Sequence, residues 1–265
     1  MRLAWLTDLH LNGIPPGKIE ELHAELLAED PDVVLVGGDI GNADTFPSLL
    51  KGMEERFQRP IFFVLGNHDF YGGRLADGRR IAAEMSKGSP WLRWLPEVGL
   101  VELTDQTGLL GHGSWADGRF GSGIGSMVLL NDYLLIRDFI SLNQGKRFEK
   151  LNSMGDEAAG FFERILPSAV KRFRRLILLT HVPPFREATW HEGRVSDDDW
   201  LPHFSCKAVG EVLVRIMVGH PGCHLTVLCG HTHGEGEVRI LENLLVKTGG
   251  AVYGKPKIQG ILDVP

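Results

Sequence analysis

Five short polar segments of this chain carry the residue types that bind divalent cations. The first contains Asp8 and His10; residues two apart in an extended segment point to one face about 6.5–7 Å apart, so both can converge on one cation. In the second, Gly37 and Gly38 allow a tight turn, and the two carboxylate oxygens of Asp39 can bridge ions about 3.5–4 Å apart. Neither segment is specific alone, because D-x-H is a common tripeptide and the second segment is more typical of an ordinary turn in which Asp39 caps a helix.

Three further segments extend this set of oxygen and nitrogen donors. Asn67 offers a neutral amide oxygen, and the adjacent His68 can donate or accept a proton near neutral pH. His181 is the donor of the fourth segment, whereas His231 and His233 repeat the two-residue spacing of the first. A single histidine at the end of a strand is more often a hydrogen-bonded structural residue than a metal ligand. The occurrence of all five segments together indicates one shared site.

Each polar segment follows a short apolar run that is typical of a buried strand. The hydrophobicity is continuous, not alternating, which indicates that both faces of each strand are covered, as inside a layered α/β protein. Because open α/β sheets bind ligands outside the carboxyl ends of their strands, we expect the five segments to converge. The predicted strands are Leu3–Leu6, Val33–Val36, Ile61–Leu65, Leu176–Leu179, Leu225–Leu228 and Leu244–Val246.

Helical patterns separate these runs, so the early part of the chain is predicted to be β-α-β-α-β. No linker, repeat or change in composition marks a boundary, and a single domain over residues 1–265 is expected. Two irregular insertions, near residues 111–125 and 183–204, are long enough to be functional or mobile. The predicted helices are Lys18–Ala28, Phe46–Phe57, Arg79–Met85, Phe161–Phe173 and Val209–Val218.

The ordered segments resemble the calcineurin-like metallophosphoesterase superfamily, whose blocks D-x-H, G-D, G-N-H-[DE], H and G-H-x-H occur here between Asp8 and His233. The resemblance implies a four-layer αββα sandwich, with two central mixed β-sheets flanked by helices. It also implies two metal ions and leaves His68 as a catalytic residue that is not a ligand. Carried over residue by residue, the ligands are Asp8, His10, Asp39 and His233 for one ion and Asp39, Asn67, His181 and His231 for the other.

This donor set predicts the chemistry of the centre. It contains oxygen and imidazole nitrogen but no thiolate, which points to Mn, Fe, Mg or a catalytic Zn or Ni site, with Mn favoured. Two such ions can activate a shared water, so we expect attack of a bridging hydroxide on phosphorus while His68 stabilises or protonates the leaving group. Asp69, favoured slightly over Asn42, is a candidate for orienting an imidazole. A turn or capping role is an equal expectation for either residue.

The substrate contacts are expected in the irregular stretches. Arg119 could pair with a phosphate, and His112 and Trp115 could stack on a base or line a leaving-group pocket; the alternative is a surface loop with Trp115 in the core. The Ser/Thr protein phosphatase branch is disfavoured, because Asp39 is followed by Ile40 and not by the arginine of that branch.

Composition and charge narrow the functional classes. The chain has 265 residues, 43% of them hydrophobic, and a formal net charge of −6, which disfavours nucleic-acid binding and a membrane-spanning chain. A bound cation would still allow an anionic substrate. The three cysteines have no metal-type spacing and are expected to be reduced and buried. No signal-peptide pattern is found near the first residues, so a cytoplasmic location is expected.

The sequence thus predicts a dinuclear metal-dependent hydrolase of small phosphomonoesters or phosphodiesters, with nucleotides or cyclic nucleotides among the candidate substrates. One alternative is a non-catalytic scaffold on the same fold, which the presence of His68 and of every ligand type disfavours. The other is a nuclease, which needs a basic track that this sequence lacks. The oligomeric state is left open.

Overall fold

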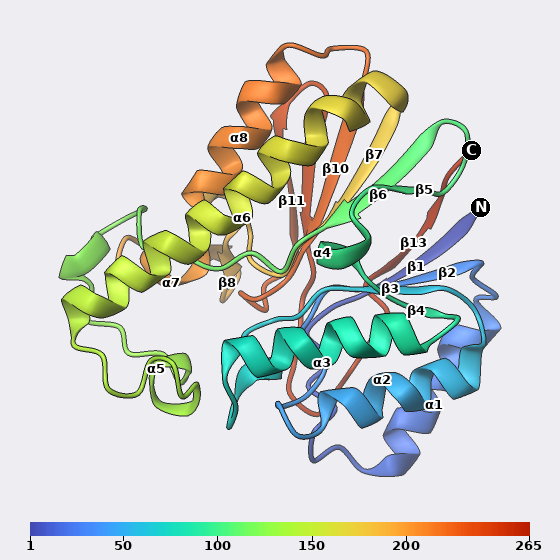
Figure 1. Ribbon diagram of the computed structural model, residues 1–265, viewed down its shortest axis with the longest axis horizontal. Helices are drawn as coiled ribbons and strands as arrows, with labels where there is room; N and C mark the ends of the chain where they lie inside the picture. Colours follow the sequence, from blue (N-terminus) through green and yellow to red (C-terminus); the bar gives the residue numbers. More distant parts are fainter.

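Two mixed β-sheets form the centre of the protein, and helices cover the outer face of each (Figure 1). The computed structural model describes residues 1–265. The first sheet has the order β13-β1-β2-β3-β4, in which β1 to β4 are parallel and β13 is antiparallel to β1. Its strands are β1 (Arg2–Leu6), β2 (Val33–Val36), β3 (Ile61–Phe63), β4 (Leu92–Trp94) and β13 (Gly260–Asp263).

The second sheet has the order β11-β12-β10-β7-β6-β5. Its four inner strands are parallel, and β11 and β5 form antiparallel edges. A separate hairpin pairs β8 (Trp190–His191) with β9 (Arg194–Val195). The strands of the second sheet are β5 (Val101–Glu102), β6 (Thr107–Gly111), β7 (Arg175–Leu179), β10 (His224–Cys229), β11 (Gly236–Leu241) and β12 (Leu244–Thr248).

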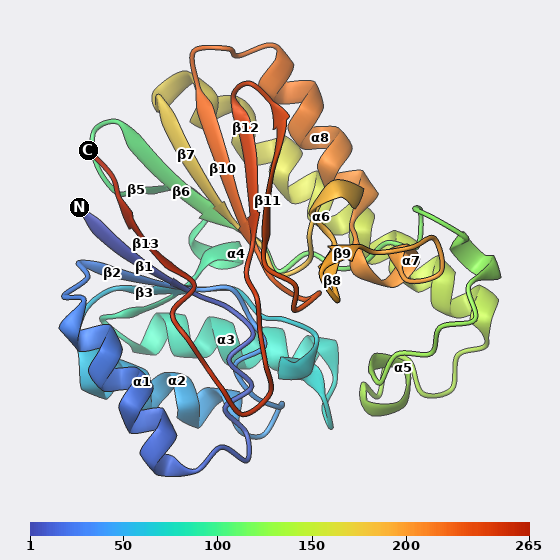
Figure 2. The same cartoon turned by 180° about the vertical axis from the view of Figure 1, so that it is seen from behind.

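The helices form the two outer layers. In both views, α1 (Pro16–Ala28), α2 (Phe46–Phe57) and α3 (Leu75–Gly88) cover the first sheet, whereas α6 (Gln144–Arg172) and α8 (Lys207–Val218) cover the second (Figure 2). The predicted four-layer αββα sandwich is confirmed. The shorter helical segments are α4 (Leu95–Val98), α5 (Asp132–Leu135), α7 (Leu201–Phe204), η1 (His68–Phe70), η2 (Gly123–Gly125) and η3 (Arg186–Ala188).

Three apolar clusters hold these layers together. One lies between the first sheet and its helices, a second between the other sheet and its helices, and a third joins the inner faces of the two sheets. Trp5 of the first sheet and Leu179 of the second both belong to the third cluster. Burial on both faces explains why the strands are continuously apolar, since water reaches neither side. The three cysteines are buried, as expected.

The six predicted strands and five predicted helices are present, with some different ends. The largest difference is α6, which begins at Gln144, although the apolar pattern predicted a helix only from Phe161. Asn143 caps this helix by accepting a hydrogen bond from the backbone N–H of Lys146 (2.9 Å). Polar residues and glycines dilute the apolar spacing of its first half. Packing of side chains such as Leu151, which is fully buried, therefore decides its length.

The two insertions differ in their structure. The first has little regular structure, and the chain after it extends through α5 to one side of the sandwich (Figure 1). The second contains η3, the β8–β9 hairpin and α7. None of the helices combines the length and apolar composition that crossing a bilayer requires. The single domain stays a prediction.

Candidate metal centre

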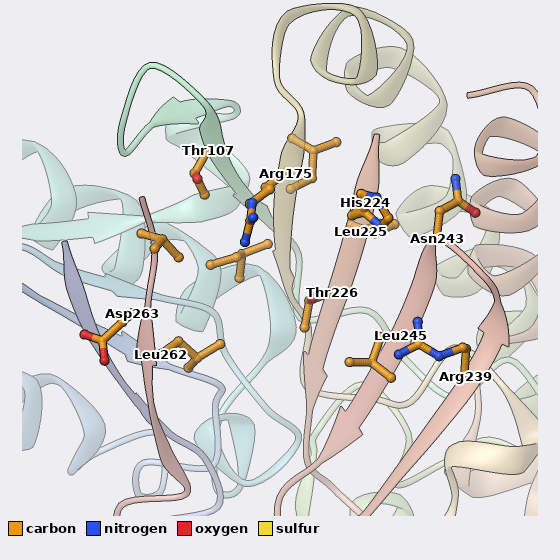
Figure 3. A pocket seen from close by; sticks show the side chains of 13 residues that line it. Thr107, Arg175, His224, Leu225, Thr226, Arg239, Asn243, Leu245, Leu262 and Asp263 are labelled. Atoms are coloured by element: carbon orange, nitrogen blue, oxygen red, sulfur yellow. The ribbon is translucent and has the colours of Figure 1, made fainter. Parts of the chain in front are cut away.

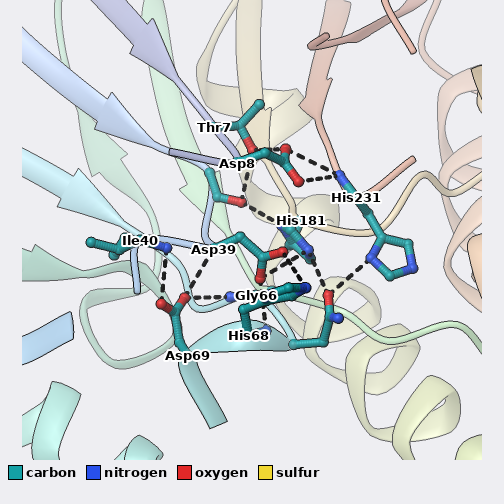
Figure 4. Close-up of polar contacts among 12 residues, drawn as sticks. Thr7, Asp8, Asp39, Ile40, Gly66, His68, Asp69, His181 and His231 are labelled. Carbon is teal, nitrogen blue, oxygen red and sulfur yellow. Dashed lines mark hydrogen bonds and ion pairs between the residues drawn. The ribbon is translucent and has the colours of Figure 1, made fainter. Parts of the chain in front are cut away.

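The five polar segments meet where the two sheets come together, at the carboxyl ends of β1, β2, β3, β7 and β10 (Figure 4). Hydrogen bonds tie the segments across the sheets. The His181 ring donates from Nδ1 to the Gly37 carbonyl (2.9 Å), and the His231 backbone N–H donates to the Asp8 carboxylate (2.9 Å). The structure thus brings together all seven residues expected to be ligands.

Four of these residues form one tight group. The ligand atoms of Asp8, His10, Asp39 and His233 lie within 4.8 Å of one another. The Nε2 atoms of His10 and His233 are 3.0 Å apart, and Nε2 of His233 is 3.4 Å from Oδ1 of Asp8. This group is the set expected for the first ion.

A second group surrounds the side-chain oxygen of Asn67. Oδ1 of Asn67 lies 3.0 Å from Nε2 of His181 and 2.9 Å from Nδ1 of His231. Asp39 lies between the two groups: Oδ1 is 3.4 Å from Nε2 of His181, and Oδ2 is 3.8 Å from Nε2 of His10. Its two oxygens therefore face different groups, as a bridging carboxylate requires.

The atoms of the second group are all electron-pair donors. Burial lowers the pKa of His181 to about 4 and also lowers the pKa of His231, so each ring is neutral at pH 7 and carries one N–H. His181 uses that N–H on the Gly37 carbonyl, and His231 uses Nε2–H on the carbonyl of His203 (2.9 Å). The remaining ring nitrogens face Asn67 Oδ1 with lone pairs. A cation among them would relieve this repulsion, so the residues fit a metal ion.

The charges of the first group also fit a cation. Burial lowers the pKa of His10 to about 3, which leaves that ring neutral at pH 7. Burial together with the charges of Asp8 and Asp69 raises the pKa of Asp39 well above its ordinary value. Two divalent ions would offset this accumulation of buried carboxylates.

The backbone at the site is unusual. Only nine non-glycine residues of the protein have a positive φ, and five of these belong to the expected ligand set. Asp8 (φ 52°) and His10 (φ 44°) are left-handed and not extended, so they converge by a different geometry from the expected one. Such conformations cost free energy and persist where the surroundings enforce them, commonly at functional sites. The five are Asp8, His10, Asp39, His231 and His233.

Asp69 has the turn role that was the alternative expectation for this residue. Its carboxylate does not orient an imidazole but accepts backbone N–H bonds at 2.9 Å from Asp39, 2.9 Å from Ile40, 3.0 Å from Gly41 and 2.9 Å from Gly66. It therefore fastens the turn after β2 to the turn after β3 (Figure 4). Asn42 closes a turn with Thr45 before α2.

Residues that the sequence interpretation missed set the orientation of Asn67. Its Nδ2 donates to Oδ1 of Asp132 (2.8 Å), which also accepts a hydrogen bond from the hydroxyl of Tyr71 (2.7 Å). The amide oxygen is thereby turned toward His181 and His231. Asp132 belongs to α5, far from every motif, and its only signal is a lone acid in an apolar stretch.

Replacing Asp132 by alanine is expected to weaken metal binding. The Asn67 amide would lose the acceptor that fixes its orientation, and the loss of such an outer partner typically costs about 10-fold to 100-fold in metal affinity. Titration with Mn²⁺ measures the effect. The control is Asn131→Ala, because Asn131 is an exposed neighbour at the start of α5. Equal Mn²⁺ affinity in the two variants would contradict the role of Asp132.

His68 lies at the edge of the two groups. Its side chain is 17% exposed, and its Nε2 is 3.9 Å from Oδ2 of Asp39. The ring stacks on Tyr71 with centroids 4.2 Å apart and meets the edge of His10 at 4.5 Å. Burial and the neighbouring imidazoles lower its pKa to about 2. The position suits a group that meets the substrate and is not itself a ligand.

The three residues expected to contact the substrate have other partners. Trp115 is buried in the core between Phe70 and Phe139, which agrees with the alternative expectation for this side chain. Arg119 pairs with Asp156 (2.7 Å) and Asp117 (3.3 Å). His112 packs with its ring centroid 5.2 Å from that of Phe161 and accepts a hydrogen bond at Nδ1 from the Ser114 N–H. None of the three side chains lies among the expected metal ligands, so the structure does not support a substrate role for them.

A groove of about 460 Å³ lies at the opposite end of the sandwich (Figure 3). It is lined by Arg175 and His224, the first residues of β7 and β10, and by Asp263 at the end of β13. The expected ligands lie after the other ends of β7 and β10. This groove is therefore not part of the site.

Comparison with known proteins agrees with this geometry. The model of the calcineurin-like phosphoesterase family matches residues 1–235. Phosphopantetheinyl hydrolase (PptH) from Mycobacterium tuberculosis has a TM-score of 0.61 at 14% identity, over 97% of this chain and 94% of that one. A dimetal phosphatase from Danio rerio has a TM-score of 0.59 at 12% identity, over 94% and 87%. These likenesses show a shared fold. No protein with a curated description matches the sequence.

Proposed function

This chain belongs to the calcineurin-like phosphoesterase family and is a metal-dependent phosphoric ester hydrolase, and from that premise we propose that it hydrolyses small phosphomonoesters or phosphodiesters at the site around Asp39. The observation that carries the proposal is the arrangement of lone-pair donors on either side of this carboxylate. Its two oxygens face His181 and His10 at 3.4 Å and 3.8 Å.

The roles of the residues follow from their positions. Two divalent ions, when bound, would lower the pKa of a water molecule and neutralise phosphoryl oxygens. Asp8, His10, Asp39 and His233 would hold one ion, and Asp39, Asn67, His181 and His231 the other. His68 lies beside this centre and would donate a hydrogen bond or proton to the leaving oxygen. The negative charge of a bound phosphoester would favour the protonated ring there.

The donor types also bear on which ions the site would hold. Oxygen and imidazole nitrogen suit Mn, Fe, Mg, Zn or Ni, and we favour Mn. Both monoesters and diesters, including nucleotides and cyclic nucleotides, are proposed substrates. The dimetal phosphatase from Danio rerio supports the class of reaction by its fold and name. The cytoplasmic location stays a prediction.

Metal dependence tests the proposal. We expect the protein to hydrolyse a generic aryl phosphodiester or phosphomonoester when Mn²⁺ is added, to lose this activity in the presence of EDTA, and to regain it when Mn²⁺ is restored. Absence of hydrolysis with every divalent metal tried would instead favour a non-catalytic scaffold. Retention of DNA by the protein at physiological salt would favour a nuclease.

A further inference from the structure

Tyr253 lies against the imidazoles of the metal centre although it belongs to none of the five segments. Its ring centroid is 4.6 Å from that of His10, 5.2 Å from His233 and 6.2 Å from His68. The residue is nevertheless 61% exposed. One side of this aromatic ring therefore covers the cluster, while the rest is open to solvent at the edge where His68 stands.

The segment that carries Tyr253 is fixed in place. It joins β12 to β13, and the backbone N–H of Ala251 donates to the carbonyl of His233 (3.0 Å). The side chain of Gln259 bonds to both the N–H (3.1 Å) and the carbonyl (2.9 Å) of Gly250. Lys18 donates from Nζ to the carbonyl of Gly254 (3.2 Å). Because the backbone around Tyr253 is held in this way, it loses little conformational freedom when a ligand packs on the ring.

An exposed aromatic ring offers little to folding, since burial of apolar surface is what stabilises the fold. At this position the ring offers an apolar surface to the part of a bound substrate that extends out of the metal centre. The proposed function places His68 next to the leaving oxygen of the substrate, and the rings of His68 and Tyr253, 6.2 Å apart, both pack against His10. The group attached to that oxygen would therefore meet the open part of the Tyr253 ring, where a planar ring gains offset or edge-to-face stacking.

We infer that Tyr253 is a specificity-determining residue of this enzyme and that the favoured substrates are phosphoesters whose leaving group carries an aromatic ring. The inference rests on the proposed function. The contact is made by the aromatic ring of Tyr253 and does not require its hydroxyl group.

Paired substrates test this inference. The kcat/KM of the enzyme is measured with Mn²⁺ on a phenyl and an ethyl ester of phosphate, and the phenyl-to-ethyl ratio of each variant is divided by that of the unaltered protein, which cancels the intrinsic reactivity of the two esters. We expect Tyr253→Ala to lower the ratio roughly threefold to tenfold, mainly through KM on the phenyl ester. Tyr253→Phe should keep the ratio within about twofold, since its ring is retained.

Val252→Ala is the matched control, because Val252 is an equally exposed neighbour (62%) outside the aromatic contacts. It should leave the ratio unchanged. A ratio unaffected by Tyr253→Ala, or an equal loss on both esters with depleted metal content, would overturn the inference and leave Tyr253 a merely structural residue. An equally low ratio in Tyr253→Phe would assign the effect to the hydroxyl and contradict stacking. If the unaltered protein hydrolysed neither ester with any metal, the proposed function itself would fail.

Discussion

Replacing Asp39 by alanine is expected to release both metal ions and to abolish hydrolysis. Asp39 is only 1% exposed, and it is the one carboxylate whose two oxygens face the two donor groups, toward His10 and toward His181. Loss of an outer partner of a ligand costs up to about 100-fold in metal affinity, and loss of a shared ligand should cost more. If one ion stayed bound, hydrolysis would still be lost, because two ions are needed to stabilise the attacking and leaving oxygens of the phosphoryl group.

Metal analysis after gel filtration measures this effect directly. The control is Asp44→Ala, which removes an exposed carboxylate from the same segment and should keep both ions. Asp39→Asn is the second variant, because it retains one oxygen and the approximate volume of the side chain. It should lose more metal than the control even if the alanine variant folds poorly. Full occupancy of both sites in Asp39→Asn and Asp39→Ala would remove Asp39 as the bridge.

The local features of the site could be predicted because they depend on neighbours in sequence. Continuously apolar strands mark buried positions, and parallel strands bring the segments after them to one edge of a sheet. Both conditions are visible in the residues themselves. Donor types such as the imidazole of His181 are equally visible. For this reason the seven expected ligands are found together, at the ends of β1, β2, β3, β7 and β10.

The supporting contacts could not be predicted because they join residues far apart in sequence. Asp69 accepts N–H groups from a turn about 30 residues away, and Asp132 reaches Asn67 across 65 residues. Neither pairing leaves a periodic or compositional trace. The same reason explains the substrate residues: Trp115 lies in a glycine-rich stretch typical of a binding loop, yet Phe70 and Phe139 cover it in the core.

Left-handed backbone at the ligands is another feature beyond the reach of local reasoning. The sequence predicts an extended Asp8-Leu9-His10 segment, because that conformation brings the side chains of Asp8 and His10 to one face. In the structure the backbone of both Asp8 and His10 is left-handed, with their N–H groups donating to the carbonyls of Gly38 (3.1 Å) and Asp39 (2.8 Å). The neighbouring turn therefore imposes this conformation, and that turn comes from a different strand.

Replacing His68 by alanine is expected to lower kcat by about 100-fold to 10,000-fold while both metal ions remain bound. The His68 ring lies outside the group formed by Asp8, His10, Asp39 and His233, so the ions would keep their ligands. The effect should depend on the leaving group. An alkoxide is a strong base and needs a proton or hydrogen bond as the bond to phosphorus breaks, whereas a nitrophenolate is stable without one.

The measurement is therefore kcat of His68→Ala on an alkyl and on a nitrophenyl ester, together with its metal content. A large loss on the alkyl ester and a small loss on the nitrophenyl ester identify His68 as the group that assists departure. Loss of metal would indicate that His68 is a ligand. An equal loss of kcat on both esters would indicate that His68 binds the phosphoryl group. Val252→Ala serves again as the control, since Val252 is exposed and is not among the ring contacts of His68. Because Tyr253 is proposed to act on the ring of the leaving group and His68 on its oxygen, the two substitutions should have opposite preferences: Tyr253→Ala harms aryl esters most, and His68→Ala harms alkyl esters most.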